Sequence, residues 1–429
     1  MFITKDILPD LSLLFCLLLG GLLVIGCRHK SVPKTPSTDQ VQAAERRSQA
    51  RKGLNDAPVN VKDFGAKGNG RTDDTEAIRI ALSFAQQNNR YVVFFPEGRY
   101  MVKGNNVRIS KRVLTNAFEI GSHPIELRGE GPEKSVIKVN SKNPVRLFKS
   151  NAIVKHFSCS KMGFIGNEAA DFQGGVAFAF ERFKGVHIHD CHFYNFSGMA
   201  FLGGNSPEFI SRDFVFQNNK VDGRNLITAA GIHLYNAHDI KVNNNTFIRV
   251  ARPFDLEVDG NREIRNAEFV ENTVRDGDRA TRAKGESYTG VHIELEDQSS
   301  VHNIRILRNQ FKNNCDDCTP GSKLGGGDIF IDNNGYGVID SIFIEGNKIE
   351  GPKTQNSSAA AILIENVKYA KVTNNILVNP KSPQRGIEID ALQSGVVENN
   401  EIDKRFTQRI YEINCNKKKI TVRNNRSIE

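Results

Sequence analysis

Histidine and acidic residues recur at matching places in a series of short alternating segments. The segments read GIHLY, PFDLE, GVHIE, IFID, ILIE and GIEID, and they begin at Gly231, Pro253, Gly290, Ile329, Ile362 and Gly386. Alternate side chains of a strand face opposite ways, so the polar residues point outward if the apolar ones point inward. Stacked strands would then carry one outward column of His233, Asp255, His292, Phe330, Leu363 and Glu388. A second column would hold Tyr235, Glu257, Glu294, Asp332, Glu365 and Asp390.

Paired carboxylates in such a column could hydrolyse a glycosidic bond, with one acting as acid and the other as base or nucleophile. Carboxylates on adjacent strands have their roots about 5 Å apart, and those two strands apart about 10 Å. Both retaining and inverting spacings are therefore open. Crowding would also raise the pKa of one carboxyl group, as an acid catalyst needs. The catalytic candidates are Asp255, Glu257, Glu294 and Asp332.

The same region offers groups that could bind a sugar. His233 and His292 could orient sugar hydroxyls. A lyase acting on uronates would instead need cations, which Arg252, Arg282 and Lys284 could supply, and only this alternative brings in calcium, held by acidic side chains. Hydrolysis needs no cofactor. A third reading is that these polar residues merely keep an exposed sheet soluble.

The elements that position these residues form a repeat. Pairs of apolar alternating positions are followed by a polar pair that ends in Asn, and the sequence holds 42 Asn in 429 residues. The marked positions are Asn219, Asn245, Asn272, Asn309, Asn347, Asn375, Asn400 and Asn425. Repeats of this length with short strands predict an all-β solenoid, a single-stranded right-handed parallel β-helix. Asn suits its turns because it tolerates the left-handed backbone region and can bond to the next coil.

Two insertions in the repeat, Arg275–Thr289 and Asn313–Gly327, come immediately before candidate strands. Long loops on a regular scaffold often carry function, so we expect them to overhang the site. The second insertion contains Cys315 and Cys318, a lone C-x-x-C without a second ligand pair for zinc. A small disulfide loop is the more natural expectation in an oxidising compartment.

The N-terminal residues predict export. An apolar run from Leu11 to Gly26 ends at Cys27, and its close VIGC resembles the lipobox of bacterial lipoproteins. We therefore expect a signal peptide over residues 1–27 with Cys27 lipidated, a polar tether over 28–57 and the β-helix over 58–429. This predicts a lipid-anchored protein of the bacterial cell envelope, at the outer membrane or cell surface. An uncleaved anchor helix is the alternative.

Net charge does not favour a nucleic-acid partner. The formal charge is +9, but residues 57–400 contribute only +2 of it, so the basic excess lies mainly at the two ends. A basic tail is not a basic binding face.

Residues Val59–Tyr100 carry a resemblance to a known group. The stretch DFGAKGNGRTDDTEAI resembles the N-terminal module of the pectate-lyase-like superfamily, which includes polygalacturonases, rhamnogalacturonases, certain lyases and phage tailspikes. Residues 58–110 would form this cap, with a helix opened by a capping box of Asp73 and Glu76. The resemblance implies an N-terminal capping helix, sugar binding over the first sheet and a polysaccharide substrate, and it leaves a homo-oligomer open.

The catalytic motifs of the best-known members do not carry over. The polygalacturonase residues G-H-G and R-I-K are missing, and the chain has no Trp for the pectate lyase pattern. The sequence thus predicts an envelope-tethered enzyme that hydrolyses an acidic or plant-type glycan. The alternatives are a uronate lyase or epimerase and, in another class, a glycan-binding or adhesin lipoprotein without catalysis.

Overall fold

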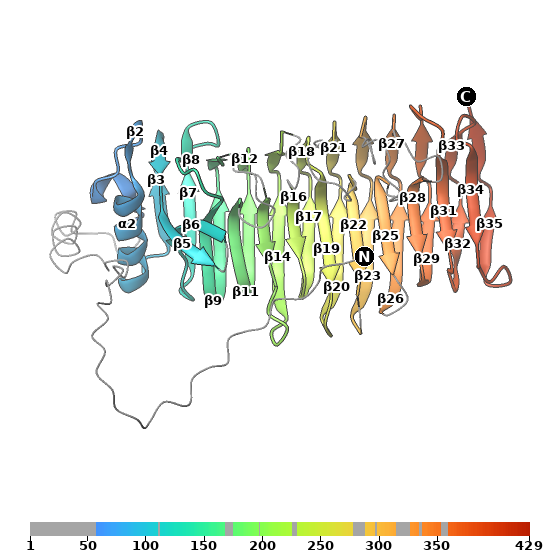
Figure 1. Cartoon of the computed structure of the whole chain (residues 1–429), viewed down its shortest axis with the longest axis horizontal. Coiled ribbons are helices and arrows are strands. Elements are labelled where there is room, and N and C mark those ends of the chain that lie inside the picture. Colours follow the sequence, from blue (N-terminus) through green and yellow to red (C-terminus); the bar gives the residue numbers. More distant parts are fainter. Residues whose placement is uncertain are drawn as a thin grey trace, which may run out of the picture. The chain divides into compact units, whose positions relative to one another are not determined.

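Three short strands make up each coil of the protein, and the coils stack in parallel (Figure 1). The computed structural model describes residues 57–109, 112–167, 175–196, 198–224, 230–277, 288–296, 298–314, 327–333, 337–352 and 359–429. Nearly all strand pairs are parallel; the hairpin of β5 and β6 is antiparallel. The predicted parallel β-helix is confirmed.

The three strands of each coil form three series. The first series, which carries the candidate site, comprises β13 (Met199–Gly203), β16 (Ala230–Leu234), β19 (Arg252–Val258), β22 (Val291–Leu295), β25 (Ile329–Asn333), β28 (Ala360–Glu365), β31 (Arg385–Asp390) and β34 (Gln408–Ile413). The second comprises β14 (Ser211–Gln217), β17 (Ala237–Asn243), β20 (Glu263–Val270), β23 (Ser300–Leu307), β26 (Val338–Glu345), β29 (Val367–Thr373), β32 (Ser394–Glu398) and β35 (Ile420–Arg423). The third comprises β10 (Gly163–Ile165), β12 (His192–Tyr194), β15 (Lys220–Asp222), β18 (Thr246–Ile248), β21 (Thr273–Arg275), β24 (Gln310–Lys312), β27 (Lys348–Glu350), β30 (Ile376–Val378), β33 (Glu401–Asp403) and β36 (Arg426–Ile428).

The first coils are less regular. They contain β1 (Val59–Asn60), the 3-10 turn η1 (Val61–Phe64), β2 (Asn69–Asp73), α2 (Thr75–Gln87), β3 (Val92–Phe95), β4 (Gly98–Val102), β5 (Asn105–Ile109), β6 (Arg112–Glu119), β7 (Ile125–Gly129) and β8 (Ser135–Val139). The long strands β9 (Val145–Ser160) and β11 (Val176–His189) run through both of the first two series, because β11 pairs with β13 and also with β14.

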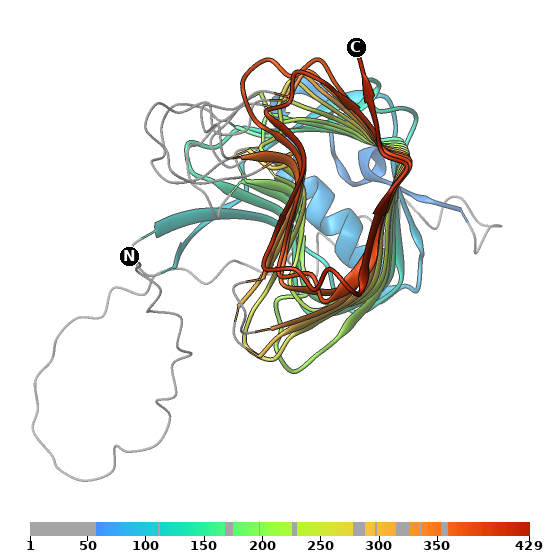
Figure 2. The ribbon, with the colours of Figure 1, turned by 90° about the vertical axis from the view of Figure 1, so that its right-hand side faces the viewer.

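Helix α2 lies at the N-terminal end of the coils, and the view along the stack shows it within their outline (Figure 2). Its apolar face, including Ile78, Leu82 and Ala85, is buried in the same core as the strands. The predicted capping box is wrong. The helix begins at Thr75, whose amide and hydroxyl both donate to Asp73, while the Asp74 carboxylate accepts from the amides of the preceding loop.

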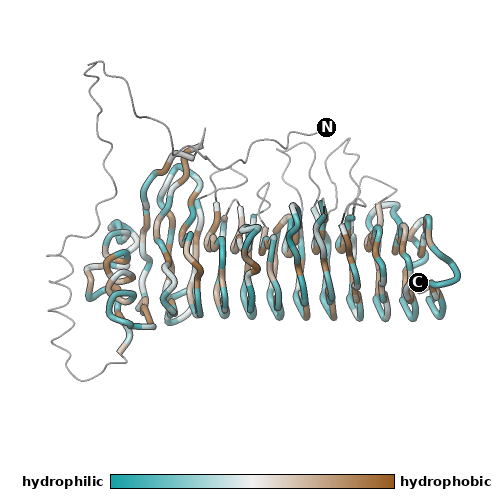
Figure 3. The backbone as a smooth tube through the Cα atoms, turned by 90° about the horizontal axis from the view of Figure 1, so that it is seen from below, coloured by the Kyte–Doolittle hydropathy of each residue, from teal (hydrophilic) through white to brown (hydrophobic). Residues whose placement is uncertain are grey.

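Apolar side chains fill the inside of the coils. Apolar and polar residues alternate along the backbone tube of the coils (Figure 3). Aromatic rings stack from coil to coil, and the centroids of Phe216 and Phe247 are 6.5 Å apart and those of Phe247 and Phe269 5.9 Å apart. This continuous core holds the outward columns in register, because a one-residue slip would turn the apolar set to solvent. No helix among the described residues is long and apolar enough to cross a membrane.

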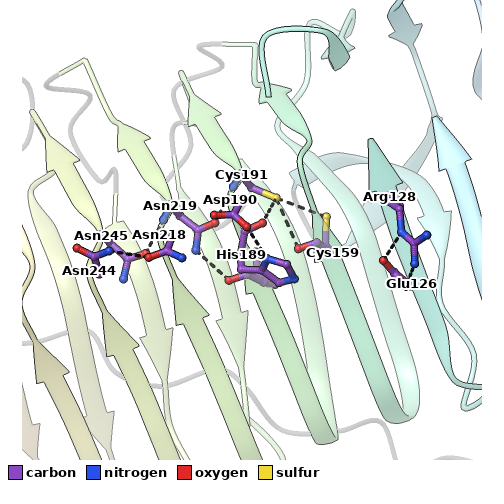
Figure 4. Close-up of polar contacts among 11 residues, drawn as sticks. Glu126, Arg128, Cys159, His189, Asp190, Cys191, Asn218, Asn219, Asn244 and Asn245 are labelled. Carbon is purple, nitrogen blue, oxygen red and sulfur yellow. Dashed lines mark hydrogen bonds and ion pairs between the residues drawn. The ribbon is translucent and has the colours of Figure 1, made fainter. Parts of the chain in front are cut away.

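The predicted Asn ladder is present along the turn between the second and third series. The Oδ1 atom of Asn245 accepts from the backbone amide of Asn219 at 2.8 Å, and the contact repeats on each coil to Asn425 (Figure 4). One expectation about these residues is wrong. The left-handed backbone belongs to the residue before each ladder Asn, for example Asn218 with φ 54° and Arg308 with φ 53°. The ladder Asn itself is there for its amide.

A cysteine replaces Asn where the ladder begins. Cys191 stands in the Asn place, its amide donates to Oδ1 of Asn219 at 2.9 Å, and its sulfur lies 3.8 Å from that of Cys159 (Figure 4). Both thiols are buried, and burial raises the pKa of Cys159. The predictions for Cys27, for the tether and for Cys315 and Cys318 lie outside the described residues.

Candidate functional site

Strand register places the two predicted columns on the outer face of the first series. His233 pairs with Asp255, which pairs with His292, which pairs with Phe330. We call this the histidine column. Two residues further along each strand, Glu257 pairs with Glu294 and Glu294 with Asp332. With Glu365 and Asp390, which are paired with each other on β28 and β31, these residues make up the acidic column.

Asp255 is the centre of a buried polar network. Its Oδ1 lies 2.8 Å from Nδ1 of His292, and its Oδ2 lies 3.1 Å from Nδ1 of His233 and 3.4 Å from a guanidinium nitrogen of Arg252. The side chains of Asp255 and His233 are each only 2% exposed. A carboxylate at this depth is stable only when paired, and here three cationic or proton-donating groups surround it.

Each imidazole also reaches the acidic column. The Nε2 atom of His233 lies 3.2 Å from Glu257, and that of His292 lies 3.7 Å from Glu294. The contacts of His233 are at ion-pair distance, but neither ring nitrogen meets the alignment of a hydrogen bond. Both histidines therefore lie between a buried carboxylate and a more exposed one.

The protonation of this network follows from its charges. Burial alone would lower the pKa of His233, but Asp255 and Glu257 outweigh burial and raise it to about 9. Conversely, burial would raise the pKa of Asp255, and His233, Arg252 and His292 together hold it well below its usual range. His233 is thus an imidazolium at neutral pH, held between two carboxylates.

The acidic column divides into two parts. Burial would raise the pKa of Glu257, yet the contact with His233 lowers it. Further along, burial raises the pKa of Glu294 and of Asp332, with neighbouring carboxylates adding to the effect at Glu294. Burial, Asp332 and Asp390 raise the pKa of Glu365 to about 7. Groups that ionise near neutrality can exchange protons with a substrate.

Tyr235 and Arg262 complete the edge of the site. The ring of Tyr235 lies 4.5 Å from that of His233, and the guanidinium of Arg262 lies 5.4 Å from the Tyr235 ring. Burial and the charges of Glu257 and Asp255 raise the pKa of the Tyr235 phenol, which therefore stays protonated. Alternation places Tyr235 and Glu365 in the second outward column, but the predicted site does not include them. The sequence around these two residues contains no motif that marks them as functional.

The predicted residues fall into three groups. Asp255, His233 and His292 are brought together but are almost fully buried, so they position other groups and do not contact a sugar directly. Glu257 and Glu294 are partly exposed on adjacent coils, with 34% and 26% of the side chain accessible, and Asp332 follows on the next coil. Arg252 joins the network, while Arg282 and Lys284 lie outside the described residues.

One group of described residues lies close enough together to hold a metal ion once His233 has lost its proton. Single ligand atoms of His233, Asp255 and Glu257 all lie within 4.8 Å of one another. One imidazole and two carboxylates suit a transition metal better than calcium, which prefers oxygen ligands throughout. The acidic column offers such oxygens at Asp332, Glu365 and Asp390.

Comparisons with known proteins agree with the parallel β-helix fold. Residues 58–250 match the family model described as rhamnogalacturonase A/epimerase, pectate lyase-like. The N-terminal fragment of bacteriophage phi29 gene product 12 superposes with a TM-score of 0.52 at 14% identity, covering 90% of this chain and 68% of that one, which shows a shared fold alone. The match over residues 58–250 agrees with the resemblance of the N-terminal module to the pectate-lyase-like superfamily.

Two curated relatives share a short stretch of sequence. The chain is 51% identical over 80 residues to alginate lyase 7 of Azotobacter vinelandii, a match that covers 19% of this chain and 9% of that protein. It is 38% identical over 80 residues to mannuronan C5-epimerase AlgE3 of the same organism, covering 19% and 4%. This chain therefore aligns with less than a tenth of either relative, both of which are enzymes that modify polysaccharides.

Proposed function

We propose that the protein modifies a uronate polysaccharide by removing the proton next to the sugar carboxylate, as a lyase or an epimerase. The observation that carries the proposal is the network around Asp255, which places Arg252 of β19 near Glu294 of β22, a carboxylate of raised pKa on the outer face. The family match, with epimerase in its description, and the lyase and epimerase among the relatives support the same reaction class.

The reaction needs a cation, a base and an acid. A cation beside the sugar carboxylate makes the neighbouring C–H bond more acidic, and Arg252, with 23% of its side chain exposed, can take this role. Glu294 accepts the proton, since its raised pKa brings it closer to the working pH. Tyr235, protonated at the edge of the same network, donates one.

Lyase and epimerase share the first step and differ in the second. After the C5 proton moves to Glu294, a lyase breaks the C4–O bond, forms a C4–C5 double bond and protonates the leaving oxygen from Tyr235. An epimerase returns a proton to C5 from the opposite face, and Tyr235 is its source. His233, Asp255 and His292 hold Arg252 and the two carboxylates in place from beneath.

Calcium fits the acidic column by its donor chemistry. Asp332, Glu365 and Asp390 offer carboxylate oxygens on successive coils, the ligands that calcium prefers. A calcium ion there would supply positive charge against which a second uronate could rest. We therefore expect activity on a uronate polymer to fall on chelation and to return with calcium.

Hydrolysis, the first expectation from the paired carboxylates, is the second candidate. Asp332 and Glu365 share a side-chain hydrogen bond, and the pKa of Glu365 is raised to about 7, as a general acid requires. The comparisons lend hydrolysis no support. An envelope location through Cys27 stays a further proposal, to be checked by mass spectrometry of the mature N-terminus.

The deciding experiment incubates the full chain with mannuronan, guluronan, polygalacturonate and a neutral glucan. A lyase produces unsaturated uronates with ultraviolet absorbance, and an epimerase incorporates solvent deuterium at C5 without shortening the polymer. We expect one of these signals, its loss in Glu294→Gln and Arg252→Gln, and its retention in Asp340→Asn on another face. New reducing ends without absorbance would replace the proposal by hydrolysis, and binding without any product would replace it by an adhesin.

A further inference from the structure

Opposite charges face each other between coils at several places on the described surface of the solenoid. Arg308 pairs with Glu271 on the preceding coil at 2.9 Å, Lys371 with Glu345 at 3.0 Å, and Arg423 with Glu398 at 2.6 Å. Arg249 with Asp222 and Arg426 with Glu401 repeat the pattern. Such cross-strand pairs stabilise a sheet, whereas like charges directly opposite each other destabilise it.

Two long stacks among the described residues depart from this pattern. One is the acidic column of the candidate site. The other is cationic and lies on the strands of the second series, where Lys155 pairs with Lys184, and Lys184 with Arg212. The register continues through His238 and Arg265 to His302. We call these six residues the cationic stripe.

The first three members of the stripe are exposed and uncompensated. Within the described part of the chain, the side chains of Lys155, Lys184 and Arg212 make no ion pair or hydrogen bond, and Lys184 lies over the ring of Phe209 at 5.6 Å. Adjacent coils bring these cations to about 4.8 Å spacing at their roots. A like-charged stack that costs stability and is not neutralised within the chain is suited to a ligand that neutralises it.

Acidic residues border the later members. Arg265 contacts Glu263 at 2.6 Å, and the same carboxylate lies 3.5 Å from His238. His302 lies 3.8 Å from Asp340. Asp213 follows Arg212 at the bend of the strand, where its backbone is left-handed with φ 59°. The strongest positive potential therefore lies over Lys155, Lys184 and Arg212.

We propose that the cationic stripe is a second binding surface, which holds a linear polyanionic glycan along the axis of the solenoid. The cations repeat along a straight line, once per coil, and a linear polymer with one carboxylate per sugar presents its charges in the same manner. Nucleic acid fits less well, because sites for single strands interleave exposed aromatic platforms with cations, and the Phe209 ring beneath Lys184 is only partly exposed.

The identification of the glycan as a uronate rests on the proposed function, whereas polyanion binding by the stripe does not. The stripe belongs to the second series of strands, and the candidate site to the first. The three exposed cations lie on the coils that precede the site, and the later members lie on the coils of β16, β19 and β22. A polymer held on the stripe would keep the chain on its substrate between reactions at the candidate site. The expected consequence is a preference for long over short uronate chains.

The test compares two triple variants by calorimetric titration with polymannuronate and polygalacturonate. Lys155→Gln, Lys184→Gln and Arg212→Gln together remove the stripe, while Arg308→Gln, Lys371→Gln and Arg423→Gln remove three cations that are already paired. We expect the first variant to bind about tenfold more weakly or worse at low salt, with a shallower dependence on salt. The second should bind like the wild type, and both should turn over short oligomers at the wild-type kcat.

Equal losses in both variants, or no loss in either, would overturn the proposal. Tighter binding of single-stranded DNA than of either glycan, lost in the stripe variant, would overturn the glycan as occupant. The two proposals can fail separately. Binding that depends on the stripe without any product sinks the enzyme alone, and product formation with unchanged polymer affinity in the stripe variant sinks the stripe alone.

Discussion

The acidic column and the cationic stripe are both stacks of like charge, yet the protein treats them differently. In the acidic column, Glu257 and Glu294 are each approached by a histidine from the neighbouring column, and Asp255 lies buried beneath with Arg252. Lys155, Lys184 and Arg212 have no such partners among the described residues. An internally compensated stack can shift pKa values and carry out chemistry, whereas an uncompensated one can only attract a counter-charge.

The largest effect is expected from Asp255→Asn, which removes the buried carboxylate that holds the compensating cations in the candidate site. His233, His292 and Arg252 would lose the carboxylate that holds them, and Glu257 and Glu294 would shift in turn. We expect activity on the uronate substrate to fall by about 10²–10³-fold, the size of losing one preorganised electrostatic contact. Turnover would be measured on protein whose circular dichroism and urea midpoint are followed in parallel.

Asp340→Asn is the control for this substitution, since Asp340 is exposed on β26. Retention of more than half of the activity in Asp255→Asn, with the fold intact, would show that the network does not position the reacting groups.

The pH dependence of stability should reveal the imidazolium at His233. Its pKa is about 9 in the folded protein and about 6.5 in an unfolded chain. Its contribution to the free energy of unfolding is therefore fully present below about pH 6.5 and is lost as the pH rises through about 9. The measurement is urea unfolding of the wild type and of His233→Gln from pH 6 to 10.

We expect the difference in stability between these two proteins to shrink steadily across that window. A difference that stays constant with pH would mean that His233 is neutral, and that the acidic column is compensated by Arg252 alone.

A smaller effect is expected where the acidic column lacks histidines. The raised pKa of Glu365, about 7, means that ionisation there costs stability as the pH rises from about 4.5 through 7. Glu365→Gln should therefore stabilise the protein at pH 8 by up to about 1 kcal/mol, the size of one like-charge cross-strand pair, and leave it unchanged at pH 4. Thermal unfolding at the two pH values would check this.

Glu257→Gln is the matched comparison, because Glu257 has a lowered pKa and contacts His233. It should destabilise the protein at pH 8. The same sign of change for both variants would contradict the division of the column into compensated and uncompensated parts.

The smallest effect is expected from the stripe. Lys184→Gln removes the middle of three stacked cations and should raise the melting temperature by about 1 °C or less at low salt. The gain should vanish in high salt, since exposed charges are screened. A loss of stability at low salt would mean that Lys184 has a favourable contact, and the stripe would no longer be an uncompensated stack.

Much of the architecture could be predicted from sequence because a solenoid repeats locally. Alternation assigned His233, Asp255 and Glu257 to outward columns, and the spacing of the Asn turns gave one coil after another. The details at the turns were less accessible. The left-handed residue proved to be the one before each ladder Asn, and α2 begins at Thr75 without the predicted capping box. Such features depend on backbone angles that several residue types can adopt.

The sequence by itself determined which residues share a face and which coils follow each other, because both depend on local periodicity. Only the tertiary structure decided their chemistry. His233, Asp255 and His292 face outward as predicted, yet they are buried, and burial among charges is what makes His233 an imidazolium and Asp255 a permanent carboxylate. The cationic stripe is likewise a product of the tertiary structure. Lys155, Lys184 and Arg212 are about 30 residues apart in sequence, and strand register alone makes them neighbours.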